Sequence, residues 1–524
     1  MVHRRPALPA GHGELLVRPE YAEWAELAEQ NRARSAAWEF DVAGRSVQEL
    51  RAVARNEFLA RAEAFSSRLG VAVASPGDPS ATIVATGHQT ELYHPGVWVK
   101  DFLLQRLADD TDATAVDVMV DSDGFDTVAI TAPCLVPEVR RCRQTLAVGT
   151  AGGWFAATPL PRASDIDAFV DAALGMLETL PAPAVRRHFV TFGGHLRSAA
   201  ADAHNLAELV TFARRRYEAE AGTDYLELPV TSMVRGEAFA AFVAQLALDA
   251  PRFAEAYNAE LQEFRTATRT RSKAQPFPDL EIDGISVELP LWALAPAGRS
   301  TVVAVDRGEA VELRAGGALL TSLPKEPAAA IEAILACEIA LAPKALALTT
   351  FVRLFCCDLF IHGVGGGRYD SVTDGVISRY FGVAPPRFVV ASLTMYLPLG
   401  SHVVTEDEIA EAKDRLNRLE HNPDALLDEV DFDSDDERHR ACSLADEKSR
   451  LVTEIASPDA DKKALGMRIR EVNADLSAIL APLKESFAAE VASLEAQREA
   501  SEVLTDRTYP FCLWSPEEVA DKVR

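Results

Sequence analysis

Two short polar segments carry side chains that could transfer protons and bind an amine. The first is Gly87–Gly96, with the sequence GHQTELYHPG, and the second is Asp121–Asp126, with the sequence DSDGFD. Imidazoles exchange protons near neutral pH, and carboxylates bind ammonium groups through charge-assisted hydrogen bonds. In the catalytic set that we predict, a histidine accepts a proton and an aspartate binds the amine. Its members are His88, His94, Asp121 and Asp123.

A third segment is rich in glycine and is typical of anion binding. His362 is followed by Gly363, Val364 and then Gly365–Gly367. Glycines between a strand and a helix let backbone N–H groups point at an anion, at the positive end of the helix. The spacing is neither that of the dinucleotide fingerprint GxGxxG nor that of a P-loop. The segment therefore predicts an anion-binding turn but no particular nucleotide.

The elements around these segments predict that the segments meet. The apolar run 81–86 indicates a buried strand, 97–108 an amphipathic helix, and 115–120 a second buried strand. This βαβ pattern predicts parallel strands, whose carboxyl ends share the sheet edge where such folds bind ligands. A further strand over 358–361 and a helix over 371–381 would bring the glycine-rich segment to the same edge.

The predicted substrate contacts come from all three segments and from the helix after the first. They are Gly87, Gln89, Thr90, Lys100, Asp126, His362, Gly363, Gly365, Gly366, Arg368, Tyr369 and Asp370. Two alternatives stay open, because His94 could simply cap its turn and His362 could be a buried core histidine. No metal is predicted, since no local spacing such as HExxH accompanies these side chains.

The predicted fold class is α/β, with a Rossmann-like parallel sheet core, small insertions and a C-terminal antiparallel coiled coil. The expected domains are 1–275, a Rossmann-like core with an N-terminal helical lead-in and a helical insertion; 276–326, a small β insertion; 327–400, the second part of the core; 401–503, the coiled coil; and 504–524, a C-terminal anchor. The coiled coil is inferred from apolar residues at steps of three and four between Leu465 and Leu494. Helix breakers at Pro423 and Pro458 divide it into arms.

The composition is that of a soluble globular protein with several structural units. The chain has 524 residues, which is too long for one core, and a net charge of −26. Such a charge disfavours binding to nucleic acid or to an anionic membrane. No run of 18 apolar residues indicates a membrane span. The seven cysteines lack regular spacing and predict buried free thiols in a reducing cytoplasm.

Three stretches resemble the cysteine-adding enzymes of bacillithiol biosynthesis. TGHQTELYHPG, followed by a helix that carries Lys100, is similar to their TGQQ…GP…K segment, and DSDGFD resembles their EDHDxxE loop. LAPKALALTTFVRLFCCDLFIHGVGGG resembles their LxPxxLxRP…QD…GPGE segment. The resemblance implies a Rossmann-type core, a homodimer formed largely through the coiled coil, and addition of cysteine to a glucosaminyl-malate acceptor. His88 in place of a glutamine, and the missing glutamate after the glycines, allow a changed substrate.

The function predicted is carbon–nitrogen ligation between a small-molecule amine and an amino acid. Forming an amide in water needs an activated acyl group, for which ATP is the usual source, so ATP or ADP is the expected nucleotide. The expected partner is a second copy of the chain. Binding to nucleic acid or to a membrane is not expected. The alternatives are a Rossmann-like nucleotidyltransferase and a non-catalytic coiled-coil scaffold.

Overall fold

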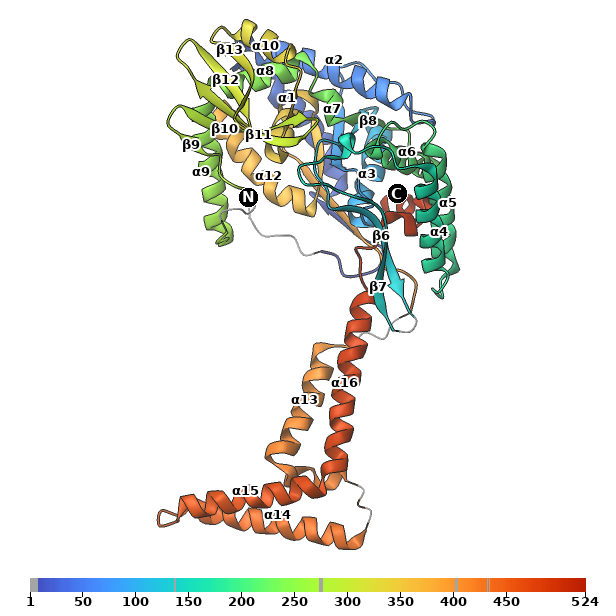
Figure 1. Cartoon of the computed structure of the whole chain (residues 1–524), viewed down its shortest axis with the longest axis vertical. Helices are drawn as coiled ribbons and strands as arrows, with labels where there is room; N and C mark the ends of the chain where they lie inside the picture. Colours follow the sequence, from blue (N-terminus) through green and yellow to red (C-terminus); the bar gives the residue numbers. More distant parts are fainter. Residues whose placement is uncertain (1–7, 136–137, 273–276, 401–403, 431, 433) are drawn as a thin grey trace. The chain divides into compact units, whose positions relative to one another are not determined.

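The computed structural model describes residues 8–135, 138–272, 277–400, 404–430, 432 and 434–524. The chain divides into two compact units (Figure 1). Unit 1 comprises Met1–Val136, Arg141–Leu397 and Arg507–Arg524. Unit 2 comprises Pro137–Arg140 and Pro398–Asp506.

Unit 1 is built on a mixed sheet of mostly parallel strands, which confirms the predicted α/β class. The strand order is β1-β16-β15-β4-β5-β8, and only the β1–β16 pair is antiparallel. The strands are β1 (Glu14–Arg18), β4 (Ile83–Gln89), β5 (Thr114–Val120), β8 (Leu226–Pro229), β15 (Leu359–Gly363) and β16 (Val389–Thr394). The chain order reverses between β4 and β15, because β5 and β8 continue on one side and β16 on the other. Such a switch point leaves a crevice beyond the carboxyl ends of the strands.

The βαβ unit predicted from the sequence is present at the centre of this sheet. Helix α3 (Pro95–Thr111) connects β4 to β5, which run parallel. Pro95 suits the first helical turn because its missing N–H would have no partner there. The His94 side chain accepts a hydrogen bond from the Gly96 N–H and caps the helix.

The other helices of unit 1 surround the central sheet and its insertion. They are α1 (Trp24–Ala36), α2 (Val47–Ser66), α4 (Ala163–Leu177), α5 (Pro183–Ala199), α6 (Leu206–Glu218), α7 (Val230–Met233), α8 (Glu237–Leu248), α9 (Ala250–Thr268), α10 (Pro327–Leu335), α11 (Ala345–Phe351), α12 (Val364–Val376) and α17 (Pro516–Val523). Two two-stranded sheets add to them, β2 (Asp41–Val42) with β3 (Arg45–Ser46) and β6 (Thr127–Cys134) with β7 (Arg140–Val148). Of the helices that the structure describes, none combines the length and the apolar character that a bilayer span requires.

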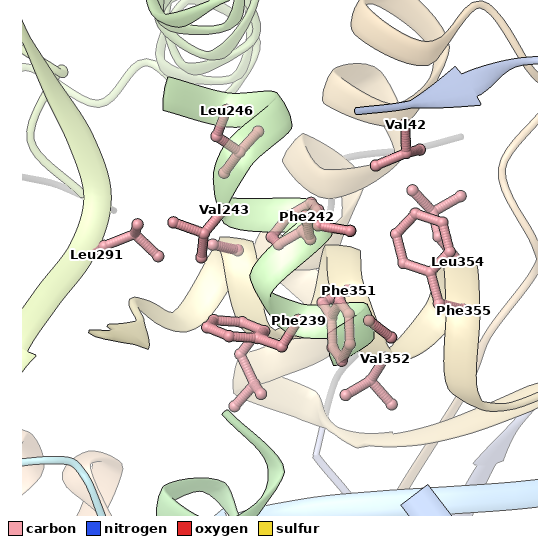
Figure 2. Packing of buried hydrophobic residues seen from close by; sticks show 14 of the residues in the cluster. Val42, Phe239, Phe242, Val243, Leu246, Leu291, Phe351, Val352, Leu354 and Phe355 are labelled. Carbon is pink, nitrogen blue, oxygen red and sulfur yellow. The ribbon is translucent and has the colours of Figure 1, made fainter. Parts of the chain in front are cut away.

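The largest hydrophobic core packs α8 against α11 and the π-helical turn that follows α11. Figure 2 shows Phe239 and Phe242 of α8 beside Phe351 and Val352. The ring centroids of Phe239 and Phe351 are 5.1 Å apart, in an edge-on arrangement. Helix α8 is apolar on most faces, as expected of a helix enclosed on all sides. Val352 also lines the cavity described below, so this core supports one of its walls.

A second sheet, antiparallel throughout, forms the insertion. Its order is β13-β12-β11-β10-β14, and β9 pairs with β10. The strands are β9 (Ile282–Asp283), β10 (Ser286–Ala295), β11 (Gly298–Asp306), β12 (Ala310–Ala315), β13 (Ala318–Pro324) and β14 (Ala340–Pro343). Strand β14 follows α10 and was not predicted as part of this sheet. It carries the chain from the insertion directly into α11.

Unit 2 consists mainly of helices. They are α13 (Glu406–His421), α14 (Asp435–Ile455), α15 (Lys462–Ile479) and α16 (Ala481–Leu504). Helix α13 packs against α16, and α14 packs against α15 (Figure 1). Small apolar clusters join them, such as Leu419 with Leu480 and Phe487.

The prediction of one continuous helical arm from Leu465 to Leu494 is wrong. Helix α15 ends at Ile479, and α16 begins at Ala481 with Pro482 in its first turn. Pro482 has no N–H to donate, and its ring would clash with a preceding carbonyl group inside a helix. The helix therefore breaks here because of Pro482. The spacing of the apolar residues alone does not reveal this break.

Two of the cysteines are not free thiols, which corrects the prediction for this pair. Cys134 and Cys142 form a disulfide that joins β6 and β7. The free cysteines are Cys337, Cys356, Cys357 and Cys512, all buried, and Cys442, which is exposed. The pairing of β6 with β7 brings positions 8 residues apart together, and cysteine spacing alone does not show this.

Candidate functional site

A cavity of about 240 Å³ lies at the switch point of the central sheet, within unit 1. Its walls come from the carboxyl ends of β4, β5 and β15, from α11 and α12, and from β10 and β11 of the insertion. The apolar part of the wall includes Val118, Val120, Leu348, Val352 and Phe360. Pockets for drug-sized ligands are typically about 300–1,000 Å³. The size of this cavity suits a molecule as small as an amino acid.

The two polar loops predicted to converge meet at this cavity through Gln89 and Asp123. The Gln89 Nε2 donates a hydrogen bond of 3.0 Å to Asp123 Oδ2. The Gly124 N–H donates to the other carboxylate oxygen at 2.9 Å. A carboxylate offers about four acceptor positions, so Asp123 can accept a further hydrogen bond from an amine.

The insertion contributes two cations to the cavity, Arg299 from β11 and Lys344 from the residue before α11. The Arg299 Nη1 donates to Asp123 Oδ1 at 2.6 Å, and the Lys344 Nζ donates to Glu288 Oε1 at 2.6 Å. Both cations flank the ring of Trp292, at 4.8 Å and 4.4 Å from its centroid. The prediction missed all three cavity residues, because strand alternation does not show which edge of another sheet an insertion covers.

The glycine-rich segment forms the first turn of α12, and the predicted helix start at residue 371 is wrong. The helix begins at Val364, with Gly363 as its N-cap and no side-chain hydrogen bond to cap it. The low helix propensity of glycine favoured a later start, but packing against the sheet outweighs it. Gly365 and Gly366 are exposed, and Gly366 lines the cavity. Their backbone N–H groups are thus placed to bind an anion.

His362, at the end of β15, lines the same cavity and is held by a carboxylate. Its Nε2 lies 2.9 Å from Asp370 Oδ2. The fully buried Arg353 also donates to Asp370. Burial alone would raise the pKa of Asp370, but Arg353 and His362 hold this pKa well below its ordinary value. Asp370 is therefore an ionised partner for the imidazole.

The His88 imidazole is held by side chains of α3 and β5, and His88 also lines the cavity. Its Nε2 lies 3.2 Å from Asp101 Oδ1 and 3.3 Å from Asp117 Oδ2, and the Tyr93 hydroxyl is 3.0 Å away. Burial lowers the pKa of His88 to about 3, so its ring is neutral. Successive side chains of a strand point to opposite faces, which explains why Gln89 contacts Asp123 while His88 contacts Asp101. This geometry does not suit the predicted role as proton acceptor.

Arg214, on α6, is the central cation of the buried cluster behind His88. It donates to Asp101 at 3.0 Å and to Asp117 at 3.1 Å, and it also contacts Glu218 and Glu227. Burial alone would lower the pKa of Arg214, but these glutamates hold it well above its ordinary value. His88, Asp101 and Asp117 have potential ligand atoms within 4.8 Å of one another. Arg214 is hydrogen-bonded to both aspartates, so the structure also accounts for these three side chains as part of a buried charge-paired core.

The remaining predicted catalytic residues are Asp121 and His94, and each accepts a hydrogen bond from a backbone N–H group. Asp121 accepts hydrogen bonds from the backbone N–H and the hydroxyl of Thr231, and burial raises the pKa of Asp121 to about 6. His94 caps α3, as the structural alternative expected. Neither residue is part of the cavity wall in the described part of the chain.

Several predicted substrate contacts also lie outside the cavity wall. The Lys100 Nζ donates to Thr86 Oγ1 at 3.1 Å and to the Gly87 carbonyl at 3.0 Å, and burial lowers its pKa. The others are Thr90, which is buried; Asp126 and Gly365, which are exposed; Gly363, the N-cap of α12; Asp370, which contacts His362; Arg368, which lies over Phe264; and Tyr369, which packs against Phe264 and Phe277. Of the predicted set, the wall contains Gly87, His88, Gln89, Asp123, His362 and Gly366.

Acidification is expected to destabilise the protein through His88. The pKa of His88 falls from 6.5 to about 3 on folding, so the unfolded state binds more protons between these values. The stability associated with the neutral ring is complete above about pH 6.5 and is lost as the pH falls, by roughly 2 kcal/mol at about pH 5. Denaturant unfolding at neutral and acidic pH measures this loss. His88→Gln should lack it, and an unchanged pH dependence in that variant would contradict the assignment.

No protein-family model matches the chain, and no curated protein is similar enough to be identified as a relative.

Proposed function

We propose that the protein is an amide-forming carbon–nitrogen ligase whose active site is the cavity at the switch point. The observation that supports this most is the composition of the cavity wall. One small cavity holds the carboxylate of Asp123, the cations Arg299 and Lys344, and the N-terminal turn of α12. To react, an amine needs a carboxylate that binds it, and an activated acid needs cations or N–H groups that bind its oxygens. Both kinds of contact must lie side by side.

Each group has a role that follows from its charge. Asp123, with Gln89 beside it, binds the amine substrate. Arg299, Lys344 and the N–H groups at the start of α12 bind the oxygens of a carboxylate or phosphoryl group. The ring of Trp292 lies against both cations and limits where they can move.

ATP is the proposed source of activation. The two cations and the open helix N-terminus fit phosphoryl oxygens, although no nucleotide fingerprint accompanies them. When bound, ATP supplies the phosphoryl or adenylyl group that makes a carboxylate reactive toward an amine. The volume of the cavity, about 240 Å³, suits the reacting groups of the substrates and not a whole nucleotide, so the adenosine would extend outside it.

The resemblance to the cysteine-adding enzymes of bacillithiol biosynthesis supports the same reaction class. The strand order β8-β5-β4-β15-β16 follows the 3-2-1-4-5 order of doubly wound folds, which favours a Rossmann-like core. We propose an amino acid such as cysteine as one substrate and a sugar-acid amine as the other, with an acceptor changed from that of the family. We also propose that the helices of unit 2 form a coiled coil that joins two copies of the chain.

A coupling assay tests the reaction. The protein is incubated with ATP, a panel of amino acids that includes cysteine, and a panel of amines that includes glucosaminyl-malate. Mass spectrometry is expected to detect an amide product, formed together with one equivalent of ADP or AMP. Nucleotide consumption without an amide would contradict ligation and favour a nucleotidyltransferase. No product and no nucleotide consumption with any pair would favour a scaffold.

A further inference from the structure

One ring nitrogen of His362 is held by a carboxylate, and the other is directed toward the cavity. Nε2 pairs with Asp370 at 2.9 Å. A side-chain carbon placed on Gly366 would lie 3.1 Å from Nδ1, and Gly366 lines the cavity. Within the described ranges, Nδ1 has no protein hydrogen-bond partner. Glycine at position 366 therefore leaves open the space in front of this nitrogen.

Asp370 determines which nitrogen of His362 carries the hydrogen. A carboxylate that stays ionised can only accept hydrogen bonds, and Arg353 and His362 keep the pKa of Asp370 low. Nε2 must then carry the hydrogen and donate it, which leaves a lone pair on Nδ1. The rings of Phe360 and Phe388 pack on the imidazole at centroid distances of 4.5 Å and 5.0 Å and limit its rotation.

The buried side chain of Arg353 holds Asp370 in place. It is fully buried, donates to Asp370, and donates to Asp374 Oδ1 at 2.6 Å. A third hydrogen bond goes to the carbonyl of Pro386, and the guanidinium lies 4.9 Å from the ring centroid of Phe388. The orientation of the imidazole is therefore determined by a chain of buried contacts and not by a flexible surface pair.

We propose that His362 is the general base of the cavity and that Asp370 and Arg353 are its positioning residues. This inference rests on the proposed ligase function for the identity of the substrate. As the bond forms between the amine nitrogen and the acyl carbon, the bond from that carbon to its phosphoryl or adenylyl leaving group breaks. The leaving group departs with the electron pair, and the proton of the amine passes to Nδ1. Asp370 then balances the charge of the imidazolium.

Two matched substitutions separate this role from a structural one. Asp370→Asn and Asp374→Asn each neutralise a carboxylate bound by Arg353, but only Asp370 contacts His362. Asp370→Asn is expected to lower kcat by about 10²–10⁴-fold with little change in KM, and to move the acidic limb of the pH profile to lower pH. Asp374→Asn should keep the wild-type profile. Equal effects of the two variants, or an unchanged profile in Asp370→Asn, would overturn the proposal.

A spectroscopic readout makes the assignment testable without turnover. Nitrogen-15 NMR of histidine-labelled protein, with the signal assigned through His362→Gln, should show hydrogen on Nε2 and none on Nδ1. Asp370→Asn, but not Asp374→Asn, should mix the two tautomers. A hydrogen on Nδ1 in the wild type would overturn the base assignment. If the tautomer is as expected but no amide forms in the coupling assay, the ligase proposal fails while His362 stays a poised base.

Discussion

Arg214→Met is expected to lower the free energy of unfolding by about 3–5 kcal/mol, because it removes the central cation from a set of buried carboxylates. The Arg214 side chain is only 3% exposed, and its partners Asp101 and Asp117 are 0% exposed. Burial raises the pKa of Glu227 well above its usual range, so a proton on this glutamate offsets part of the loss. The aspartates stay close together without the guanidinium between them. Denaturant unfolding at neutral pH measures the change.

Arg197→Met is the matched control for Arg214→Met. Arg197 lies on α5, is 37% exposed, and pairs with the exposed carboxylates Asp167 and Asp171. Ion pairs at such positions usually contribute less than about 1 kcal/mol. A loss in Arg214→Met no greater than that in Arg197→Met would show that the buried cluster does not depend on this cation.

Lys344→Met is expected to lower kcat/KM by about 10²–10³-fold, the usual effect of removing one donor to a developing anion. The fold should persist, because methionine keeps the stem that packs beside Trp292. Steady-state kinetics of the coupling reaction, together with thermal unfolding, separate the loss of activity from a loss of stability.

Lys325→Met supplies the comparison on the same insertion. Lys325 is 39% exposed and pairs with Asp306, and it is not part of the described cavity wall. Its replacement removes the same charge from the chain and should leave kcat/KM within a few-fold of wild type. Equal losses in the two variants would mean that overall charge, and not a contact in the cavity, governs activity.

The meeting of Gln89 with Asp123 could be predicted because parallel strands end at one edge. Both residues follow buried apolar runs, and β4 and β5 pair in parallel. The same reasoning brought His362 and Gly366 to the cavity from the end of β15. Alternation along a strand also turns the neighbouring side chains of His88 and Gln89 to opposite faces, so the two cannot share one role.

Arg299, Lys344 and Trp292 could not be found in this way. Trp292 and Arg299 belong to an antiparallel sheet, and Lys344 follows its strand β14; the position of this sheet over the central sheet depends on tertiary packing and not on local periodicity. The break before Pro482 is different, because a proline inside an apolar repeat was visible in the sequence.

Isothermal titration calorimetry with the amine substrate tests most directly whether the cavity is the active site. Wild-type protein, Asp123→Asn and Asp126→Asn would be compared, since both aspartates lie in one loop but only Asp123 lines the cavity. The expected result is at least about tenfold weaker binding to Asp123→Asn, equivalent to about 1.4 kcal/mol, and unchanged binding to Asp126→Asn. Equal affinity of all three proteins for the amine would contradict the proposed site.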